Sequence, residues 1–170
     1  PEVDAARLGS NQKVLLIDCD LRRPRIHRVF GKSTDTGVTT VLLTGNLDEA
    51  IIETEVPNLS VVVSGPTPPN PAELFHSDRF RQLLASASAQ FDRVIIDSPP
   101  VVAVTDPTII STLVDGTLLV ARAFAPRKDV ARAALRSIRD VGGRMAGAVL
   151  NVVDFSRMEY KYSRYYYYHR

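Results

Sequence analysis

Short apolar stretches alternate with amphipathic stretches along most of the chain. The apolar stretches are nearly continuous, which is the pattern of strands covered on both faces. The predicted strands span residues 14–18, 94–97, 117–121 and 145–153, with a shorter one at 61–63. Between them, apolar residues at helical spacing predict helices over 77–90, 106–113 and 128–141.

This alternation predicts an α/β fold, with a mostly parallel sheet flanked by helices. The carboxyl ends of parallel strands meet at one edge of the sheet, and binding sites in such sheets lie beyond that edge. The residues that follow the predicted strands at 14–18 and 94–97 are therefore the first candidates for chemistry.

Local helix signals support the predicted boundaries. Ser77 suits the N-cap of the helix at 77–90, and Gly142 suits the stop after 128–141. Upstream, Asn70, Pro71 and Glu73 predict a helix start with a capping box. The predicted apolar face of the helix at 128–141 consists of Val130, Ala134, Ile138 and Val141.

Charge and composition narrow the class of protein. A length of 170 residues suits one compact domain, and a net charge of +2 does not support a nucleic-acid binder. The single cysteine, Cys19, excludes an internal disulfide framework and fits a reducing compartment. No apolar run approaches the roughly 20 residues that cross a bilayer. The sequence begins at Pro1 without Met, so a longer parent protein is one interpretation.

Acidic residues follow two of the predicted strands. Asp18 and Asp20 flank Cys19 after the first strand, and Asp97 ends the second in the same way. If these strands are neighbours, three carboxylates face one small volume, where they repel one another unless a cation lies between them. Mg²⁺ is the natural cation, because it prefers oxygen ligands and can hold a nucleoside triphosphate. The alternative is that each aspartate caps the helix that follows it.

Residues 14–24, VLLIDCDLRRP, resemble the Walker A′ motif of the bacterial tyrosine kinases of capsule and exopolysaccharide assembly. Residues 94–100, VIIDSPP, resemble the Walker B motif of that family, and residues 65–74, GPTPPNPAEL, resemble its Pro-Asn-Pro-Ala-Glu-Leu segment. The similarity extends over roughly residues 8–168. It implies a P-loop NTPase fold of the MinD/ParA type, truncated at its N-terminus, with ATP and Mg²⁺ as cofactors.

The resemblance also implies roles for individual residues. Asp18 corresponds to the proton acceptor near Mg²⁺, Asp20 supports the metal and its waters, and Asp97 holds Mg²⁺ directly or through water. Arg22 is expected to organise the phosphate region. Asn151, at the end of GAVLN, is expected to contact the adenine edge, although an Asn that ends a strand more often forms a turn.

The family's phosphate-binding P-loop has no counterpart in this sequence. Residues 31–34, GKST, contain its last letters, but the motif needs a glycine at the position of Ile26 and a preceding strand, whereas a helical turn is predicted here. We therefore interpret residues 31–34 as a surface loop. The P-loop is expected upstream of Pro1, and because phosphate positioning dominates phosphoryl transfer, the chain alone is expected to be inactive.

All six tyrosines lie in the last eleven residues of the chain. By the resemblance, this cluster is the autophosphorylation site, reached by a neighbouring subunit in a ring. The alternative is a sticky tail that packs on a partner. The expected organisation is a truncated kinase core at 1–153 and a flexible tail at 154–170. The predicted phosphate acceptors are Tyr160, Tyr162, Tyr165, Tyr166, Tyr167 and Tyr168.

The leading hypothesis is a kinase domain that regulates exopolysaccharide or capsule synthesis and export. The implied partner is a transmembrane polysaccharide co-polymerase, fused or separate, which places the domain in the cytoplasm at the inner face of the bacterial membrane. Two alternatives stay open. One is a MinD/ParA-type ATPase that positions cellular cargo, and the other is a non-catalytic remnant that acts as an interaction module.

Overall fold

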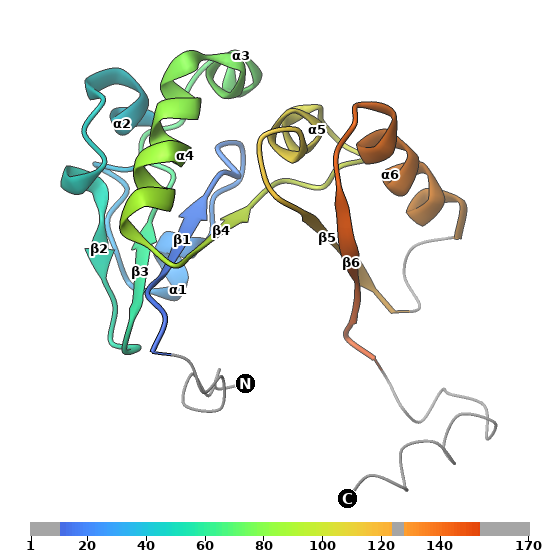
Figure 1. Ribbon diagram of the computed structural model, residues 1–170, viewed down its shortest axis with the longest axis horizontal. Helices are drawn as coiled ribbons and strands as arrows, with labels where there is room; N and C mark the ends of the chain where they lie inside the picture. Colours follow the sequence, from blue (N-terminus) through green and yellow to red (C-terminus); the bar gives the residue numbers. More distant parts are fainter. Residues whose placement is uncertain (1–10, 124–127, 154–170) are drawn as a thin grey trace, which may run out of the picture.

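The computed structural model of the chain describes residues 11–123 and 128–153. It is an α/β structure in which the strands form two separate sheets, one of four strands and one of two (Figure 1). The predicted fold class is confirmed. Among the described residues, no pairing joins the two sheets.

The larger sheet has the strand order β2-β3-β1-β4. Strand β1 lies at its centre and is parallel to both neighbours, β3 and β4, whereas the short edge strand β2 is antiparallel to β3. Strands β1 and β4 were predicted almost to the residue. The bounds are Val14–Asp18 for β1, Ile52–Glu53 for β2, Leu59–Val62 for β3 and Arg93–Asp97 for β4.

Helices pack on one face of this sheet and enclose the main core. Leu15 and Ile17 of β1 are completely buried there, and Phe75 meets Phe80 edge to face, with ring centroids 5.0 Å apart. Such aromatic pairs add to the free energy of burial. The elements before the second sheet are α1 (Ile26–Val29), α2 (Val38–Thr44), the 3-10 helix η2 (Asp48–Ala50), α3 (Pro71–His76) and α4 (Asp78–Gln90).

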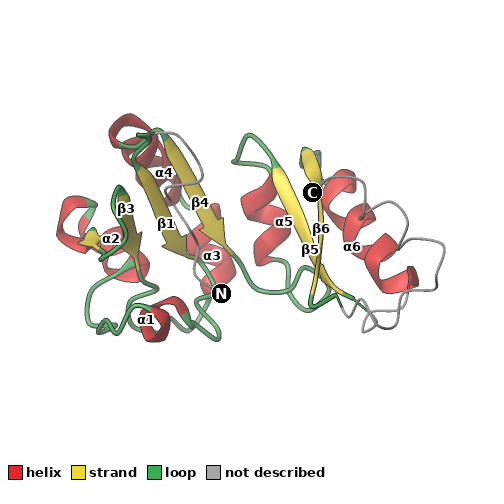
Figure 2. Ribbon diagram, turned by 90° about the horizontal axis from the view of Figure 1, so that it is seen from below, coloured by secondary structure: helices red, strands yellow, loops and turns green. Residues whose placement is uncertain are grey.

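The smaller sheet pairs β5 with β6 in parallel, and α5 and α6 accompany it. Figure 2 shows this second region beside the first, with α5 between them. Helix α5 contacts both α3 and α6, so it links the helical layers of the two regions. The bounds are Asp106–Ser111 for α5, Thr117–Arg122 for β5, Lys128–Asp140 for α6 and Met145–Asn151 for β6.

The helix boundaries show which local signals decide the structure. Ser77 caps α4 as predicted, since its hydroxyl accepts the Phe80 N–H at 3.3 Å. Gly142 has a φ of +82°, the left-handed conformation that stops α6. The predicted capping box of α3 is wrong, because the Asn70 side chain donates to Glu73 Oε1 at 3.3 Å and does not cap the backbone. Pro71 does begin the helix.

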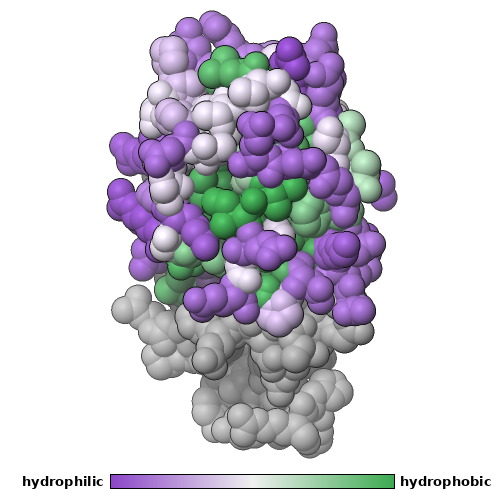
Figure 3. Space-filling model, turned by 90° about the vertical axis from the view of Figure 1, so that its left-hand side faces the viewer, coloured by the Kyte–Doolittle hydropathy of each residue, from purple (hydrophilic) through white to green (hydrophobic). Residues whose placement is uncertain are grey.

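Three elements and part of one helix face were not predicted correctly. Helix α2, η2 and β2 are short, and their sequences lack a long period. In α6, Ala134 and Ile138 are buried as predicted, but Val130 and Val141 are 39% and 46% exposed. No helix among the described residues is both long and apolar enough to span a bilayer. The surface beside β2 and α2 is mostly hydrophilic around a small apolar area (Figure 3).

Candidate active site

Asp18 is the last residue of β1, and its side chain is completely buried. The chain folds back over the carboxylate, so that Oδ1 accepts the Asp20 N–H at 3.2 Å and Oδ2 accepts the Ile26 N–H at 3.1 Å. Burial raises the pKa of Asp18 more than these hydrogen bonds lower it, and the charge of Asp97 raises it further. The result is an oriented carboxylate that holds a proton more strongly than usual.

Asp97 ends the neighbouring strand β4 in direct register with Asp18. The Cys19 N–H donates to the Asp97 carbonyl at 2.9 Å, which fixes the two strand ends together. The Asp97 side chain is exposed to solvent, yet its pKa is raised, first by partial desolvation and then by the charge of Asp20, against a hydrogen bond from the Ser98 N–H. The two strand ends therefore present two carboxylates of raised pKa side by side.

Asp20 occupies the loop after β1 and is half buried. Its Oδ1 accepts the Arg22 N–H at 3.2 Å and the Arg23 N–H at 2.9 Å, which closes a local turn. Among the described residues, no group of three or more His, Cys, Asp and Glu side chains could hold a metal ion. The Oδ1 of Asp20 turns to its own loop, and the expected convergence of Asp18, Asp20 and Asp97 on one ion stays a prediction.

The remaining pair still fits Mg²⁺. This ion is usually bound by one or two carboxylates together with waters and the phosphates of a nucleotide. Asp18 and Asp97 offer oxygen donors only, on neighbouring strands. Desolvation raises the pKa of both, and repulsion from a nearby carboxylate raises it further. A cation would relieve that repulsion. Cys19 between them is buried, which raises its pKa well above the usual value, so it remains a neutral thiol.

Arg22 lies in the same loop but is engaged in a two-pronged ion pair. Its Nε donates to Asp106 Oδ2 at 2.7 Å and its Nη2 donates to Asp106 Oδ1 at 3.1 Å. This pairing raises the pKa of Arg22. Asp106 is completely buried at the first position of α5, so the pair ties the loop after β1 to the second region. Sequence reasoning missed Asp106, whose only signal was its place before Pro107 at a helix start.

Asn151 ends β6 and belongs to the second sheet, not to the sheet that carries Asp18 and Asp97. Its Oδ1 accepts the N–H of Val152 at 2.8 Å, and Val152 adopts a positive φ of 54°. The side chain thus forms a local turn. Its expected contact with adenine stays a prediction.

Two other segments were considered in the sequence, residues 31–34 and the tyrosine cluster. Lys32 follows α1 and its N–H donates to the His27 carbonyl at 2.8 Å, so residues 31–34 form a loop after a helix, as predicted. The six tyrosines of the predicted acceptor cluster lie outside the described residues.

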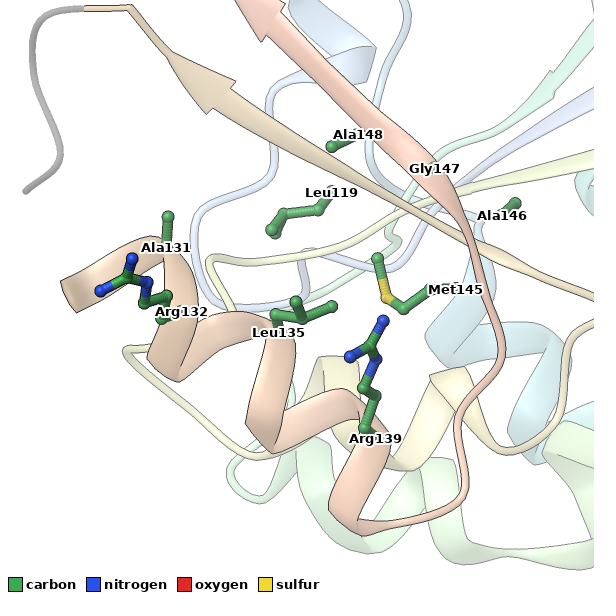
Figure 4. A pocket seen from close by; sticks show the side chains of 9 residues that line it. All are labelled: Leu119, Ala131, Arg132, Leu135, Arg139, Met145, Ala146, Gly147 and Ala148. Atoms are coloured by element: carbon green, nitrogen blue, oxygen red, sulfur yellow. The ribbon is translucent and has the colours of Figure 1, made fainter. Parts of the chain in front are cut away.

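An open cavity of about 450 Å³ lies in the second region, away from the carboxylates (Figure 4). Leu135 of α6, Leu119 of β5 and Met145 of β6 line it, with Arg132 and Arg139 on the same helix. The cavity is open to solvent, so it is a groove between α6 and the sheet rather than a void in the core.

The chain is similar in sequence to known kinases. No protein-family model matches it. It is 38% identical to the tyrosine-protein kinase YwqD of Bacillus subtilis over 158 residues, which are 92% of this chain and 65% of YwqD. The chain therefore spans slightly less than two thirds of that relative.

Solved structures agree with this similarity. The kinase domain of Escherichia coli tyrosine kinase ETK superposes with a TM-score of 0.83 at 35% identity, over 92% of this chain and 62% of that one. The kinase domain of VpsO gives a TM-score of 0.81 at 35% identity, over 87% and 74%. The septum site-determining protein MinD of Pyrococcus horikoshii, solved with Mg-ADP, gives 0.65 at 19% identity, which shows the shared P-loop NTPase fold alone.

Proposed function

The chain belongs to the bacterial tyrosine kinases, and on that premise we propose that it transfers the γ-phosphate of ATP to tyrosines of its own C-terminal cluster. One observation carries the proposal. Asp18 and Asp97 end two paired parallel strands in register, one carboxylate buried and oriented and the other exposed beside it. Phosphoryl transfer depends on positioned groups and on electrostatic stabilisation, and adjacent carboxylates at two strand ends can contribute to both.

In this proposal Asp18 accepts the proton of the attacking tyrosine hydroxyl as its oxygen bonds to the γ-phosphorus and ADP leaves. The raised pKa of Asp18 makes it a stronger base than an ordinary carboxylate. The backbone N–H groups of Asp20 and Ile26 orient its two oxygens. A bound Mg²⁺, held by Asp97 and Asp18 with Asp20 near its waters, would neutralise charge on the phosphates.

Arg22 acts differently in this proposal from the role that the family resemblance implies. Its guanidinium is already bound to Asp106 through two hydrogen bonds, so it positions the loop that carries Asp20. Asn151 is proposed to contact the adenine. The groups that bind the β and γ phosphates are not among these residues, so residues 1–170 alone are proposed to be inactive.

The tail supplies the acceptors and the regulatory output. Each phosphotyrosine adds about −1.5 to −2 charge at pH 7, so filling the cluster makes a basic tail strongly acidic. Repulsion among such tails would loosen a ring of subunits. The process proposed to respond is exopolysaccharide or capsule synthesis and export, through a transmembrane co-polymerase at the cytoplasmic face of the membrane.

The test is phosphosite mapping on the full gene product that contains residues 1–170, incubated with ATP and Mg²⁺. Phosphate is expected on residues 160–168, and Asp18→Asn should reduce its rate of formation about 100-fold or more, as expected for loss of a general base. Asp115→Asn, at an exposed turn, is the matched control and should keep the activity. Phosphate that forms at the same rate without the Asp18 carboxylate would overturn the proposal.

A further inference from the structure

The groove between α6 and the smaller sheet combines an apolar wall with two cationic side chains (Figure 4). Leu119 of β5, Leu135 of α6 and Met145 of β6 form the apolar part. Arg132 and Arg139 of α6 lie along it, and no Asp or Glu is among the described residues that line it. The mechanism proposed above uses none of these side chains. A ligand that suits the groove therefore has an apolar or aromatic body and carries negative charge.

The two arginines are available to such a ligand. Both are exposed, and neither guanidinium has an ion pair or hydrogen bond within the part of the chain that the structure describes. Residues seven apart on a helix point in nearly the same direction and lie about 10 Å apart along its axis. Figure 4 shows Leu135 between the two arginines and the guanidinium of Arg139 turned toward Met145. Guanidinium groups match phosphate groups through paired hydrogen bonds, so the row suits two phosphates about 10 Å apart.

The tyrosines of the chain recur at a spacing that fits this row. Tyr162, Tyr165 and Tyr168 follow one another at intervals of three residues. In the polyproline II conformation, which is common in chains without regular structure, residues three apart point the same way and lie about 9 Å apart. Two phosphotyrosines at this interval could each place a phosphate on one guanidinium and a ring on the apolar wall.

The same tyrosines are within reach of the groove along the chain. Strand β6 forms one wall through Met145 and ends at Asn151, after which the sequence continues into the tail. From Asn151 back to Met145 the strand spans about 20 Å. The eleven residues from Asn151 to Tyr162 can span up to about 36 Å, so the tail is long enough to double back over the groove of its own subunit.

We propose that the groove binds the phosphorylated form of residues 160–168 of this chain, with two phosphotyrosines on Arg132 and Arg139. The inference rests on the proposed function, which supplies the phosphates. Residues 154–170 contain four Lys and Arg against two Asp and Glu, so the unmodified tail is basic and is repelled by the guanidiniums. Each phosphate adds about −1.5 to −2 charge and thereby reverses the sign. The groove thus takes up the tail only after phosphate transfer and distinguishes the product from the substrate.

The test measures the binding of synthetic peptides with the sequence of residues 158–170 to the whole chain by fluorescence anisotropy. The first peptide carries phosphotyrosine at positions 162 and 165 and should bind, whereas the unmodified peptide should not. A third peptide has phosphoserine at those two positions and should bind about tenfold more weakly or less, because it has no rings to bury. A fourth has phosphotyrosine at the adjacent positions 166 and 167 and should also lose about tenfold, because its phosphates cannot reach both arginines.

Variants of the chain test the two arginines directly. Arg132→Gln combined with Arg139→Gln should weaken binding of the first peptide about tenfold or more, because both charge-assisted pairs are lost. The matched control, Arg28→Gln combined with Arg93→Gln, removes the same charge at exposed positions outside the groove and should bind like the unaltered chain. Equal weakening by both double variants, or equal binding of the first, third and fourth peptides, would overturn the proposal.

The outcomes separate this inference from the kinase proposal, because the peptides are synthetic and their binding needs no kinase activity. Binding that depends on Arg132 and Arg139, with no phosphate found on the tail in the phosphosite mapping described above, supports the groove and contradicts the proposed function. Phosphate on the tail without binding of the first peptide overturns the groove and leaves the function standing. Binding of phosphatidylserine vesicles through the same arginines, without binding of the first peptide, would assign the groove to a lipid surface and also overturn the inference.

Discussion

Around β1 and β3, helices α2 to α4 exclude water completely from Leu15, Ile17 and Phe80, whereas the β5–β6 sheet leaves Leu118 and Val120 more than half exposed. The residue types in the two regions are nearly the same. The difference lies in the layer that covers each face, since Leu15 and Ile17 point into the core under the helices, whereas Leu118 and Val120 lie on the face opposite Leu119 and α6. An apolar run thus specifies a strand, and the partners of that strand decide how much free energy its burial contributes.

The largest expected effect is the difference in lost unfolding free energy between matched Leu-to-Ala substitutions in the two regions. Leu15→Ala should cost about 2–5 kcal/mol of unfolding free energy, because it leaves a cavity in a closed core. Leu118→Ala should cost less than about 0.5 kcal/mol, since that side chain is mostly solvated. Urea unfolding of the two variants measures both values. Similar losses would show that the second region is as tightly packed as the first.

The next effect concerns the ion pair that joins the regions. Arg22→Ala leaves the buried carboxylate of Asp106 without its two hydrogen bonds and should lower the free energy of unfolding clearly. The control is Arg81→Ala, which breaks an exposed pair with Asp78 at 3.4 Å and should cost less than about 0.5 kcal/mol. Equal effects in urea unfolding would mean that Arg22 and Asp106 do not hold the regions together.

The smallest expected effect concerns the first region, where the ionised carboxylate of Asp97 lowers the stability of the folded chain. The pKa of Asp97 is raised above its ordinary 3.8, so ionisation costs stability as pH rises from that value through the folded pKa, and the cost persists above it. Asp97→Asn should therefore be slightly more stable than the unaltered chain at pH 7 and equal to it below pH 3.8. Thermal unfolding against pH measures this difference.

Added Mg²⁺ provides the second arm of that experiment. It should raise the melting temperature of the unaltered chain, because bound cation relieves the repulsion at Asp18 and Asp97, and it should act less on Asp97→Asn. A difference in melting temperature between the two chains that depends on neither pH nor Mg²⁺ would contradict the assignment of these carboxylates to a cation site.

Sequence reasoning succeeded where a local pattern alone determines the structure. The strands that contain Asp18 and Asp97 were predicted from continuous apolar runs, and Ser77 and Gly142 marked helix ends through their own backbone chemistry. Short elements such as α2 and β2 were missed, because their stability comes from tertiary packing and not from a period.

The positions of Asp18 and Asp97 at the strand ends could be predicted from the sequence, but the hydrogen-bond partners of Asp20 and Arg22 could not. Placing two carboxylates at adjacent strand ends needed only topology rules, and the register of Asp18 with Asp97 agrees with them. The turn made by the Asp20 side chain, and the choice of Asp106 as the partner of Arg22, depend on the path of loops. The division into two sheets depends on which strands are present, and no local pattern carries that information.

The contrast between the regions is tested most directly by residue-resolved hydrogen exchange on residues 1–170. Amides of β1 should exchange at least about 100-fold more slowly than those of β5, because β1 opens only with the whole core. Equal protection of β1 and β5 would contradict the account.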